Sequence, residues 1–346
     1  MERRPLGESG LDVSTVALGC FAMGGKKWGG DVRDEDSIDA IRLAIDRGVN
    51  LLDTAASYGA GHSERIVGRA VRGSREKVVL ASKIMVGFQD EDEVRMSLED
   101  SLRKLDVDCI DLYQVHVPNR ADMDANLRVL EQMERFRGEG RIRAIGVSNF
   151  STEQLDRGRQ VARIDSVQPP YSLLWRHVEM ELLPYCRRHG IAVLAYSPLG
   201  QGMLTGKYSG AVSFPEGDAR RPNLLFHPDN LDDSLAVVDV VSRIARARSR
   251  TTAQVAVRWV LQQAGVTSAL VGGKRPEQVE ENLGGDGWAL SEDELQQLNR
   301  ISQQVHERRT TTVPENLMIW QDVPDPFDEP VRSRIREQYL ESRAVT

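Results

Sequence analysis

The segment Lys77–His116 reads KVVLASKIMVGFQDEDEVRMSLEDSLRKLDVDCIDLYQVH. Two short apolar runs, Lys77–Lys83 and Cys109–His116, flank a longer stretch, Glu93–Leu105. In that stretch apolar residues recur every three or four positions, at Val94, Leu98, Leu102 and Leu105. The spacing is that of an amphipathic helix, whereas the continuous runs are typical of strands that are covered on both faces. We therefore expect a strand, a crossover helix and a second, parallel strand.

The same alternation repeats along the chain. A second helical pattern, Ser37–Arg47, has Ile38, Ile41, Ala44 and Ile45 on one face. The strand candidates are Val13–Gly19, Val49–Asp53, Lys77–Lys83, Cys109–His116, Ile142–Val147, Ile164–Gln168, Ile191–Ser197 and Thr267–Gly272. About eight such units are what a closed (β/α)₈ TIM barrel requires, so the sequence predicts that α/β fold. A doubly wound open sheet is the alternative.

Three segments lie outside the repeat or interrupt it. Leu6–Leu11 predicts a short β-hairpin that turns at Gly10 and plugs the barrel bottom. The irregular stretch Pro198–Asp232 follows a strand, and we interpret it as an active-site loop. Ser291–Glu294 has the spacing of a capping box, which predicts an extra C-terminal helix to about Val305.

We interpret residues 1–346 as a single domain, with the barrel at about 4–303 and a tail at 306–346. The tail contains the apolar run Leu317–Trp320 and a possible helix, Pro330–Ser342, which would have its proline in the first turn.

Composition narrows the class of protein. The formal net charge of −7 provides no overall basic surface for nucleic acid or an anionic membrane. No apolar run reaches the roughly 18 residues of a membrane span, and the N-terminus carries no apolar leader. The three cysteines, Cys20, Cys109 and Cys186, are odd in number and widely spaced, which argues against a disulfide framework or a zinc site. We expect a cytoplasmic protein.

Four polar residues follow successive strand candidates. Asp53 and Tyr58 come after the second, Lys83 ends the third and His116 ends the fourth. In a parallel barrel such positions meet at one mouth. A close ammonium favours a phenolate, so we expect Lys83 to lower the pKa of Tyr58 and Asp53 to hold Lys83. His116 would donate a hydrogen bond to a carbonyl oxygen, which makes the set suitable for carbonyl reduction.

Other interpretations of these residues remain open. Taken singly, an Asp after a strand is usually a helix cap, a Lys is usually solvated and a His is usually structural. A metal-dependent hydrolase using His62, His116 and Asp53 is a further hypothesis, although no HxH or HExxH spacing is present. The joint placement at adjacent strand ends favours the reductive chemistry.

Several ordered motifs resemble those of the aldo-keto reductase superfamily, from about Arg4 to about Gln303. Besides the four residues above, they are GVSNF at Gly146–Phe150, QPPY at Gln168–Tyr171, YSPL at Tyr196–Leu199 and QVEEN at Gln278–Asn282. The bacterial branch near general stress protein 69 and the potassium-channel β-subunits is the most similar. The resemblance implies a (β/α)₈ barrel, NADPH-dependent reduction of an aldehyde or ketone, and Tyr58 as the general acid assisted by Asp53, Lys83 and His116. A cofactor-binding regulatory module with little turnover, like the channel β-subunits, is the alternative function.

The expected cofactor is NADP(H), although the chain lacks the GxGxxG fingerprint and a true P-loop. At Lys274-Arg275-Pro276 two cations precede a helix start, which favours a phosphate monoester. By resemblance, Ser148, Asn149 and Gln168 would hold the nicotinamide carboxamide, Tyr196 would stack on its ring, and Gln278, Glu281 and Asn282 would contact adenosine. The remaining cofactor contacts that we expect are Cys20, Phe21, Asp53, Ser197, Pro198, Leu199, Gly200, Gln201, Lys207, Gly272, Gly273, Lys274 and Arg275.

Substrate specificity in a barrel enzyme belongs to its loops. We expect Trp28, Phe88 and Trp320 to line a partly apolar substrate pocket. The candidate substrates are small aldehydes, methylglyoxal-like compounds, aldoses and keto-sugars. A small-molecule carbonyl compound is thus the predicted partner, and a homo-oligomer is possible.

Overall fold

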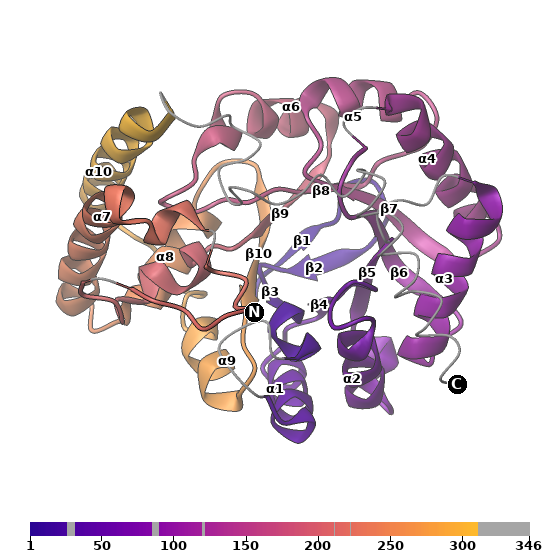
Figure 1. Cartoon of the computed structure of the whole chain (residues 1–346), viewed down its shortest axis with the longest axis horizontal. Helices are drawn as coiled ribbons and strands as arrows, with labels where there is room; N and C mark the ends of the chain where they lie inside the picture. Colours follow the sequence, from indigo (N-terminus) through magenta and orange to yellow (C-terminus); the bar gives the residue numbers. More distant parts are fainter. Residues whose placement is uncertain (26–31, 85–89, 120–121, 211, 222, 311–346) are drawn as a thin grey trace.

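A closed barrel of parallel strands forms the centre of the computed structural model (Figure 1). The structure describes residues 1–25, 32–84, 90–119, 122–210, 212–221 and 223–310. In barrel order the strands are β10 (Val266–Gly272), β3 (Val16–Gly19), β4 (Leu51–Asp53), β5 (Val79–Ile84), β6 (Ile110–Val115), β7 (Ile142–Ser148), β8 (Ser166–Gln168) and β9 (Ala192–Tyr196). The predicted (β/α)₈ barrel is confirmed, and the open sheet is excluded because β10 pairs with β3.

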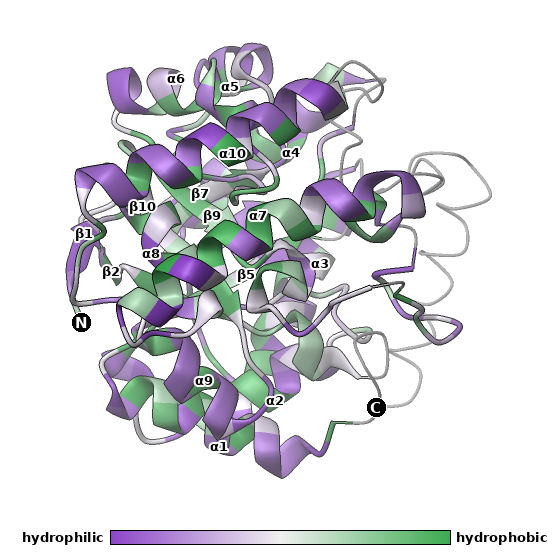
Figure 2. Cartoon of the chain, turned by 90° about the vertical axis from the view of Figure 1, so that its left-hand side faces the viewer, coloured by the Kyte–Doolittle hydropathy of each residue, from purple (hydrophilic) through white to green (hydrophobic). Residues whose placement is uncertain are grey.

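Helices surround the barrel and follow its strands (Figure 1). The α-helices are α1 (Asp34–Asp46), α2 (His62–Val71), α3 (Glu91–Leu105), α4 (Met123–Gly138), α5 (Thr152–Gly158), α6 (Leu182–His189), α7 (Pro228–Ala247), α8 (Thr252–Leu261), α9 (Pro276–Leu283) and α10 (Glu292–Thr310). Short 3₁₀ turns occur at η1 (Phe21–Gly24), η2 (Arg75–Lys77), η3 (His177–Glu179), η4 (Gly200–Thr205) and η5 (Leu224–Phe226). On the side seen in Figure 2, α1 and α9 are mostly hydrophilic, while the strand segments visible between helices are hydrophobic.

Local sequence determines where these helices begin. The Asp90 carboxylate accepts the backbone N–H of Glu93 at 2.8 Å and caps α3. At α10 the predicted capping box is present: Ser291 Oγ accepts the N–H of Glu294 at 3.3 Å, and Glu294 Oε2 accepts the N–H of Ser291 at 2.7 Å. The helix then runs to Thr310, five residues beyond the predicted end.

Two further boundaries differ from the sequence prediction in ways that have a clear local cause. The run Val13–Gly19 is divided between β2 (Asp12–Ser14), which belongs to the hairpin, and the barrel strand β3. A continuous apolar run conceals this break because both strands are buried. The irregular stretch predicted at Pro198–Asp232 ends sooner, since α7 begins at Pro228, a favoured residue for the first turn of a helix.

The N-terminal hairpin closes one end of the barrel. Its strands, β1 (Arg3–Pro5) and β2, pair antiparallel and lie across the middle of the ring of strands in Figure 1. Leu6, Leu11 and Val13 are buried against side chains of the barrel interior, which are Ala17, Leu51, Val79, Ala81, Leu112, Ala144, Ala192, Leu194 and Leu270. Gly7 presses on the backbone just before β8, where a Cβ would come within 2.2 Å of the Asp165 carbonyl oxygen. The hairpin leaves the opposite end of the barrel uncovered, and the carboxyl ends of the strands lie there.

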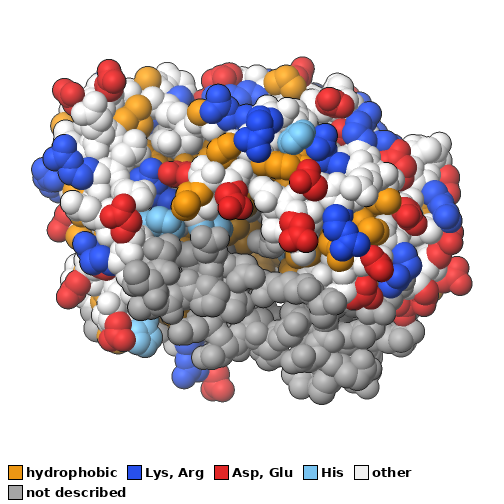
Figure 3. Space-filling view, turned by 90° about the horizontal axis from the view of Figure 1, so that it is seen from above, with side chains coloured by type: hydrophobic (Ala, Val, Ile, Leu, Met, Phe, Trp, Pro, Cys, Tyr) orange, Lys and Arg blue, Asp and Glu red, His pale blue; other side chains and the backbone are white. Residues whose placement is uncertain are grey.

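The outer surface carries mixed charge. The face in Figure 3 shows acidic and basic side chains side by side with scattered hydrophobic ones. Ion pairs between neighbouring helical segments include Arg95–Glu139 at 2.9 Å and Arg135–Glu91 at 2.9 Å. No helix in the part of the chain that the structure describes is long and apolar enough to cross a membrane.

Candidate active site

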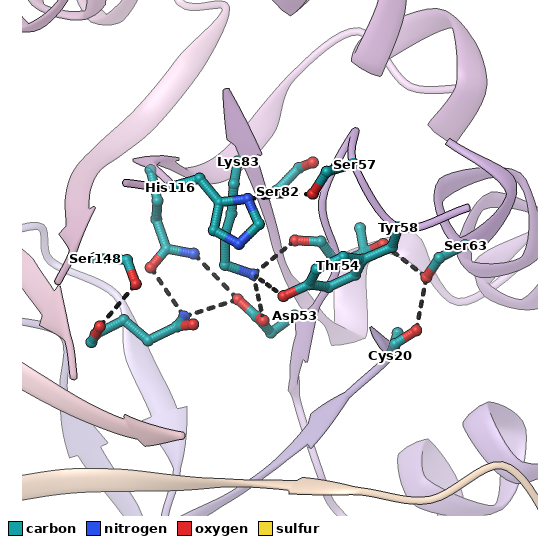
Figure 4. Close-up of polar contacts among 12 residues, drawn as sticks. Cys20, Asp53, Thr54, Ser57, Tyr58, Ser63, Ser82, Lys83, His116 and Ser148 are labelled. Atoms are coloured by element: carbon teal, nitrogen blue, oxygen red, sulfur yellow. Dashed lines mark hydrogen bonds and ion pairs between the residues drawn. The ribbon is translucent and has the colours of Figure 1, made fainter. Parts of the chain in front are cut away.

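Lys83 occupies the centre of a polar cluster at the carboxyl ends of β4 and β5 (Figure 4). Its ammonium donates to Asp53 Oδ1 at 2.6 Å, to the Thr54 carbonyl oxygen at 2.9 Å and to the Tyr58 hydroxyl oxygen at 3.1 Å. Lys83 is 1% exposed and Asp53 is 3% exposed, so the ion pair is dry. Three acceptors satisfy the three N–H groups of the ammonium. Since Tyr58 accepts from Lys83, its own hydroxyl hydrogen is directed elsewhere.

Burial and charge set the protonation of this cluster. Burial lowers the pKa of Lys83, but Asp53 and then Tyr58 oppose it, and the pKa is raised overall. Burial is the largest effect on Tyr58 and raises its pKa, with Lys83 acting in the opposite direction. The prediction that Lys83 brings the pKa of Tyr58 down is wrong in its net direction, because desolvation of the phenolate outweighs the ammonium. Tyr58 is therefore a protonated phenol near neutral pH, with its hydroxyl oxygen 3.1 Å from the Lys83 ammonium.

His116 follows β6 and lies beside the tyrosine. The centroids of the two rings are 5.6 Å apart. Burial, followed by the Lys83 ammonium, lowers the pKa of His116 to about 3. The imidazole is consequently neutral at physiological pH and is suited to hydrogen bonding without a charge. The structure thus brings together all four residues that the sequence singled out.

Gln114 is a member of this cluster that the sequence reasoning missed. Its Nε2 donates to Asp53 Oδ2 at 3.1 Å, and Gln168 Nε2 donates to the same oxygen at 2.9 Å. Gln168 Nε2 also reaches Gln114 Oε1 at 3.1 Å. A signal was present in the sequence, because Gln114 is a polar residue within an apolar strand, two positions before His116 and on the same face.

Ser148, Asn149 and Tyr196 form a chain of hydrogen bonds next to Gln168. Ser148 Oγ donates to the Gln168 carbonyl oxygen at 2.8 Å and accepts from Asn149 Nδ2 at 3.0 Å. Tyr196 donates to Asn149 Oδ1 at 3.0 Å. Asn149 has a φ of 62°, a conformation that costs energy for a residue other than glycine and is frequent at functional sites. The resemblance predicted that Ser148, Asn149 and Gln168 hold the nicotinamide carboxamide and that Tyr196 stacks on the nicotinamide ring; the structure places the four residues side by side.

The backbone after β9 turns sharply. Ser197, Gly200, Gln201 and Gly202 have φ values of 55°, 54°, 54° and 97°. Pro198 and Leu199 lie within the same turn, which continues into η4. Two N–H groups are used within the turn itself, because those of Gly200 and Gly202 donate to the carbonyl oxygens of Ser197 and Leu199 at 2.9 and 3.0 Å. The pyrophosphate contact at this turn stays a prediction.

Four cations gather near this turn. Burial lowers the pKa of Lys207, and the charges of Arg220 and Lys274 lower it further. Burial also lowers the pKa of Lys274, and the charges of Arg275 and Arg220 lower it further. Groups that repel one another in this way fit the phosphates of a dinucleotide. The sequence reasoning missed Arg220, whose only signal was its position in the predicted active-site loop. The Arg220 guanidinium donates to the two carboxylate oxygens of Asp218 at 2.9 and 2.7 Å.

The turn between β10 and α9 is braced by two of the residues assigned to adenosine. Gln278 Oε1 accepts the backbone N–H of Lys274 at 3.1 Å, and Asn282 Nδ2 donates to the Gly272 carbonyl oxygen at 3.1 Å. Glu281 is exposed, and Gly273 is packed against Val279. The turn that carries Lys274 thus has a defined shape.

The loop that holds Tyr58 is fixed by close backbone contact with η1. A Cβ on Gly59 would come within 1.8 Å of the Gly24 carbonyl oxygen. Phe21 packs edge-on against the Tyr58 ring, at a centroid distance of 4.9 Å. Cys20 is fully buried, and its backbone N–H donates to the Asp53 carbonyl oxygen at 2.8 Å. The contacts described for Cys20 are therefore internal, whereas Phe21 borders the site.

The structure does not describe every residue that the sequence predicted. Trp28, Phe88 and Trp320, and the tail segments Leu317–Trp320 and Pro330–Ser342, lie outside the described residues. His62 pairs with Asp34 at 2.9 Å. Within the described ranges, no group of three or more His, Cys, Asp or Glu side chains is placed to hold a metal ion.

Comparisons with known proteins agree with this geometry. A model of the aldo/keto reductase family matches residues 15–303. The aldo-keto reductase YhdN of Bacillus subtilis is 37% identical over 312 residues, which cover 87% of this chain and 93% of that protein. The NADH-specific methylglyoxal reductase of Escherichia coli is 34% identical over 310 residues, covering 82% of this chain and 93% of the relative.

Two solved structures show the same architecture. A glycerol dehydrogenase from Gluconobacter oxydans superposes with a TM-score of 0.77 at 38% identity, covering 86% of this chain and 94% of its own. An aldo/keto reductase from Klebsiella pneumoniae, in complex with NADP and acetate, has a TM-score of 0.69 at 29% identity, with coverage of 87% and 96%.

Proposed function

The chain belongs to the aldo/keto reductase family, and from this premise we propose that it reduces a small aldehyde or ketone to an alcohol with NADPH. The observation that carries the proposal is the Lys83 ammonium held between Asp53 and the hydroxyl oxygen of Tyr58. When bound, NADPH supplies a hydride to the carbonyl carbon. Tyr58 then gives its hydroxyl proton to the carbonyl oxygen.

The polar cluster supports this proton transfer. Lys83 stabilises the phenolate that remains on Tyr58, and Asp53 keeps Lys83 charged in a dry site. His116, being neutral, donates a hydrogen bond that positions the carbonyl oxygen beside the phenol. Gln114 and Gln168 hold the second oxygen of Asp53 and so keep the carboxylate oriented toward Lys83.

The preference for NADPH is supported by the cations near η4 and α9. The Escherichia coli relative is described as NADH-specific, so family membership alone does not decide the cofactor. Arg220 and Lys274 lower the pKa of Lys207, and Asp218, the ion-pair partner of Arg220, opposes them only in part, so the group keeps a net positive charge that suits a phosphate monoester. Ser148, Asn149 and Gln168 are proposed to hold the carboxamide, and Gln278, Glu281 and Asn282 to lie along the adenosine.

The substrate is proposed to be a small carbonyl compound such as methylglyoxal, an aldose or a keto-sugar. The relatives named for methylglyoxal and glycerol support a small and partly polar substrate. Ser57 and His116 bring polar groups to the mouth, whereas Phe21 brings an apolar surface. This combination suits a compound with a few hydroxyl groups.

The direct test is a cofactor and substrate panel. We expect NADPH to quench protein fluorescence on titration and to be oxidised in the presence of small aldehydes, with NADH giving a lower kcat/KM. Tyr58→Phe should retain NADPH binding within about twofold and lose at least about 100-fold in kcat, since the variant lacks the proton donor. The Lys83 ammonium also loses one acceptor, but it keeps Asp53 Oδ1 and the Thr54 carbonyl oxygen. Tyr185→Phe is the matched control, because that hydroxyl contacts Arg159 and Asp156 on the outer helices. Absence of NADPH binding, or an active Tyr58→Phe enzyme, would contradict the proposal.

A further inference from the structure

Ser57 makes a contact with His116 that the proposed chemistry does not yet use. Its hydroxyl oxygen lies 3.2 Å from His116 Nδ1. Figure 4 shows both side chains above the contact between Lys83 and Tyr58. A neutral imidazole carries one N–H, and the hydrogen bond made by one ring nitrogen determines which of the two carries it. The partner of Nδ1 therefore decides what Nε2 can do.

The groups around the ring favour the neutral form. Lys83 approaches from β5 with a positive charge, and Tyr58 faces the ring from the loop after β4. Lys83 is buried and charged, so a second cation beside it would be costly. The His116 backbone is fixed as well, because its carbonyl oxygen accepts from Asn149 Nδ2 at 3.2 Å.

We propose that Ser57 is a positioning residue that donates its hydroxyl hydrogen to His116 Nδ1 and thereby leaves the imidazole hydrogen on Nε2. The Nε2–H group then donates to the carbonyl oxygen of the substrate, a consequence that rests on the proposed function. In the opposite arrangement Nδ1–H would donate to Ser57, and Nε2 would present a lone pair, which repels a carbonyl oxygen.

A serine is chemically suited to this position. A carboxylate or a backbone carbonyl can only accept, so either would place the hydrogen on Nδ1. A hydroxyl can donate, and because Ser57 is exposed, its lone pairs can be satisfied by solvent. Ser57 also directly precedes Tyr58. The residue that orients the imidazole is thus adjacent in sequence to the acid.

The tautomer is measurable without turnover. The chain has six histidines, so nitrogen-15 labelling of histidine with long-range proton correlation gives a tractable spectrum, and His116→Gln assigns the resonances of residue 116. We expect an unprotonated Nδ1 and a protonated Nε2 in the native protein at pH 7. A protonated Nδ1 would overturn the proposal. If the predicted tautomer is found but no carbonyl compound is reduced, the tautomer assignment stands and the proposed function fails.

Substitutions at position 57 test the consequence for catalysis. In Ser57→Ala both tautomers should become populated and kcat should fall about 3- to 10-fold, the effect of losing one neutral hydrogen bond. Ser57→Thr should restore the native tautomer and most of kcat. The Kd for NADPH should stay within twofold in both variants. A purely structural role would not change the imidazole tautomer, and an unchanged tautomer in Ser57→Ala would refute the inference.

Ser57→Asp gives a signed prediction. The new carboxylate would accept from Nδ1–H and raise the pKa of His116, as in other carboxylate–histidine pairs. Below that pKa the imidazolium still donates through Nε2, whereas above it the neutral ring cannot. We therefore expect kcat to fall by about 100-fold as pH rises through the new pKa, comparable to the loss of an oxyanion donor. Gln297→Glu, which adds the same charge to the exposed face of α10, should keep the native pH profile. A Ser57→Asp profile that matches the native one would contradict the inference.

Discussion

Replacing Asp53 by Asn removes the charge that holds Lys83 while keeping the size of the side chain. Asp53 accepts from Lys83 through Oδ1, and from Gln114 and Gln168 through Oδ2. An asparagine has one oxygen, so its NH₂ group must face either the ammonium or the two amide donors. Either orientation brings donors together and leaves Lys83 buried without a carboxylate. Breaking a buried ion pair in this way costs about 3 to 5 kcal/mol of unfolding free energy.

The same substitution should change the pH dependence of turnover. Asp53 is the principal group that opposes the effect of burial on Lys83, so without it the pKa of Lys83 falls. Above that lowered pKa the lysine is neutral and no longer stabilises the Tyr58 phenolate. We expect kcat of Asp53→Asn to decrease as pH rises across the neutral range, whereas the native enzyme loses no activity there through Lys83.

Denaturant unfolding and a kcat profile from pH 6 to pH 9 measure these two effects. Asp165→Asn is the matched control: Asp165 is also buried and ion-paired, with Arg163 at 2.8 Å, but lies at the closed end of the barrel. It should lose about 1 to 3 kcal/mol of stability and keep the native pH profile. An Asp53→Asn enzyme whose kcat is independent of pH and within twofold of native would refute the reasoning.

The remaining predictions concern backbone fit, cofactor charge and protonation. Gly59→Ala should lower kcat and thermal stability, because its Cβ would meet the Gly24 carbonyl oxygen at 1.8 Å. Gly73→Ala is the control, because Gly73 has a φ of +78° but no atom of the described residues lies within 4 Å of the position that its Cβ would take, so this variant shows the cost of positive φ alone. Equal effects of the two substitutions would contradict the reasoning. Lys274→Ala should raise the Kd for NADPH about tenfold and that for NADH less than twofold, as measured by fluorescence titration; equal changes would exclude a phosphate contact. His116 has a pKa lowered to about 3 when folded and an ordinary value near 6.5 when unfolded. Between those values the unfolded chain binds the additional proton, so the free energy of unfolding decreases as pH falls. His116→Gln should flatten that slope in urea titrations from pH 4 to pH 6.5, and an unchanged slope would argue against a neutral imidazole in the folded protein.

Sequence periodicity predicted most of the barrel, because hydrophobic spacing is a local property of the chain. Short apolar runs and intervening amphipathic helices were sufficient for the strand order. The boundary errors have local causes. The division between β2 and β3 is hidden where two buried strands follow each other, and the early start of α7 depends on Pro228.

The grouping of the proposed catalytic residues was predictable for a related reason. Residues at the carboxyl ends of parallel strands must meet at one mouth, so the sequence alone groups Asp53, Lys83 and His116. Gln114 was missed even though its strand position carried the signal. Arg220 lies in an irregular loop, where no helical or strand periodicity predicts the direction of a side chain. Only the folded chain brings it near Lys207.

The sequence by itself thus determined which elements form, in what order they pair, and that Asp53, Tyr58, Lys83 and His116 come to the barrel mouth. The tertiary structure decided the protonation of those groups. Burial outweighs the Lys83 charge at Tyr58 and keeps His116 neutral, since desolvation depends on every element packed around a side chain. The tertiary structure also placed the Ser57 hydroxyl 3.2 Å from Nδ1 of His116, and no local pattern encodes a contact between residues 59 positions apart.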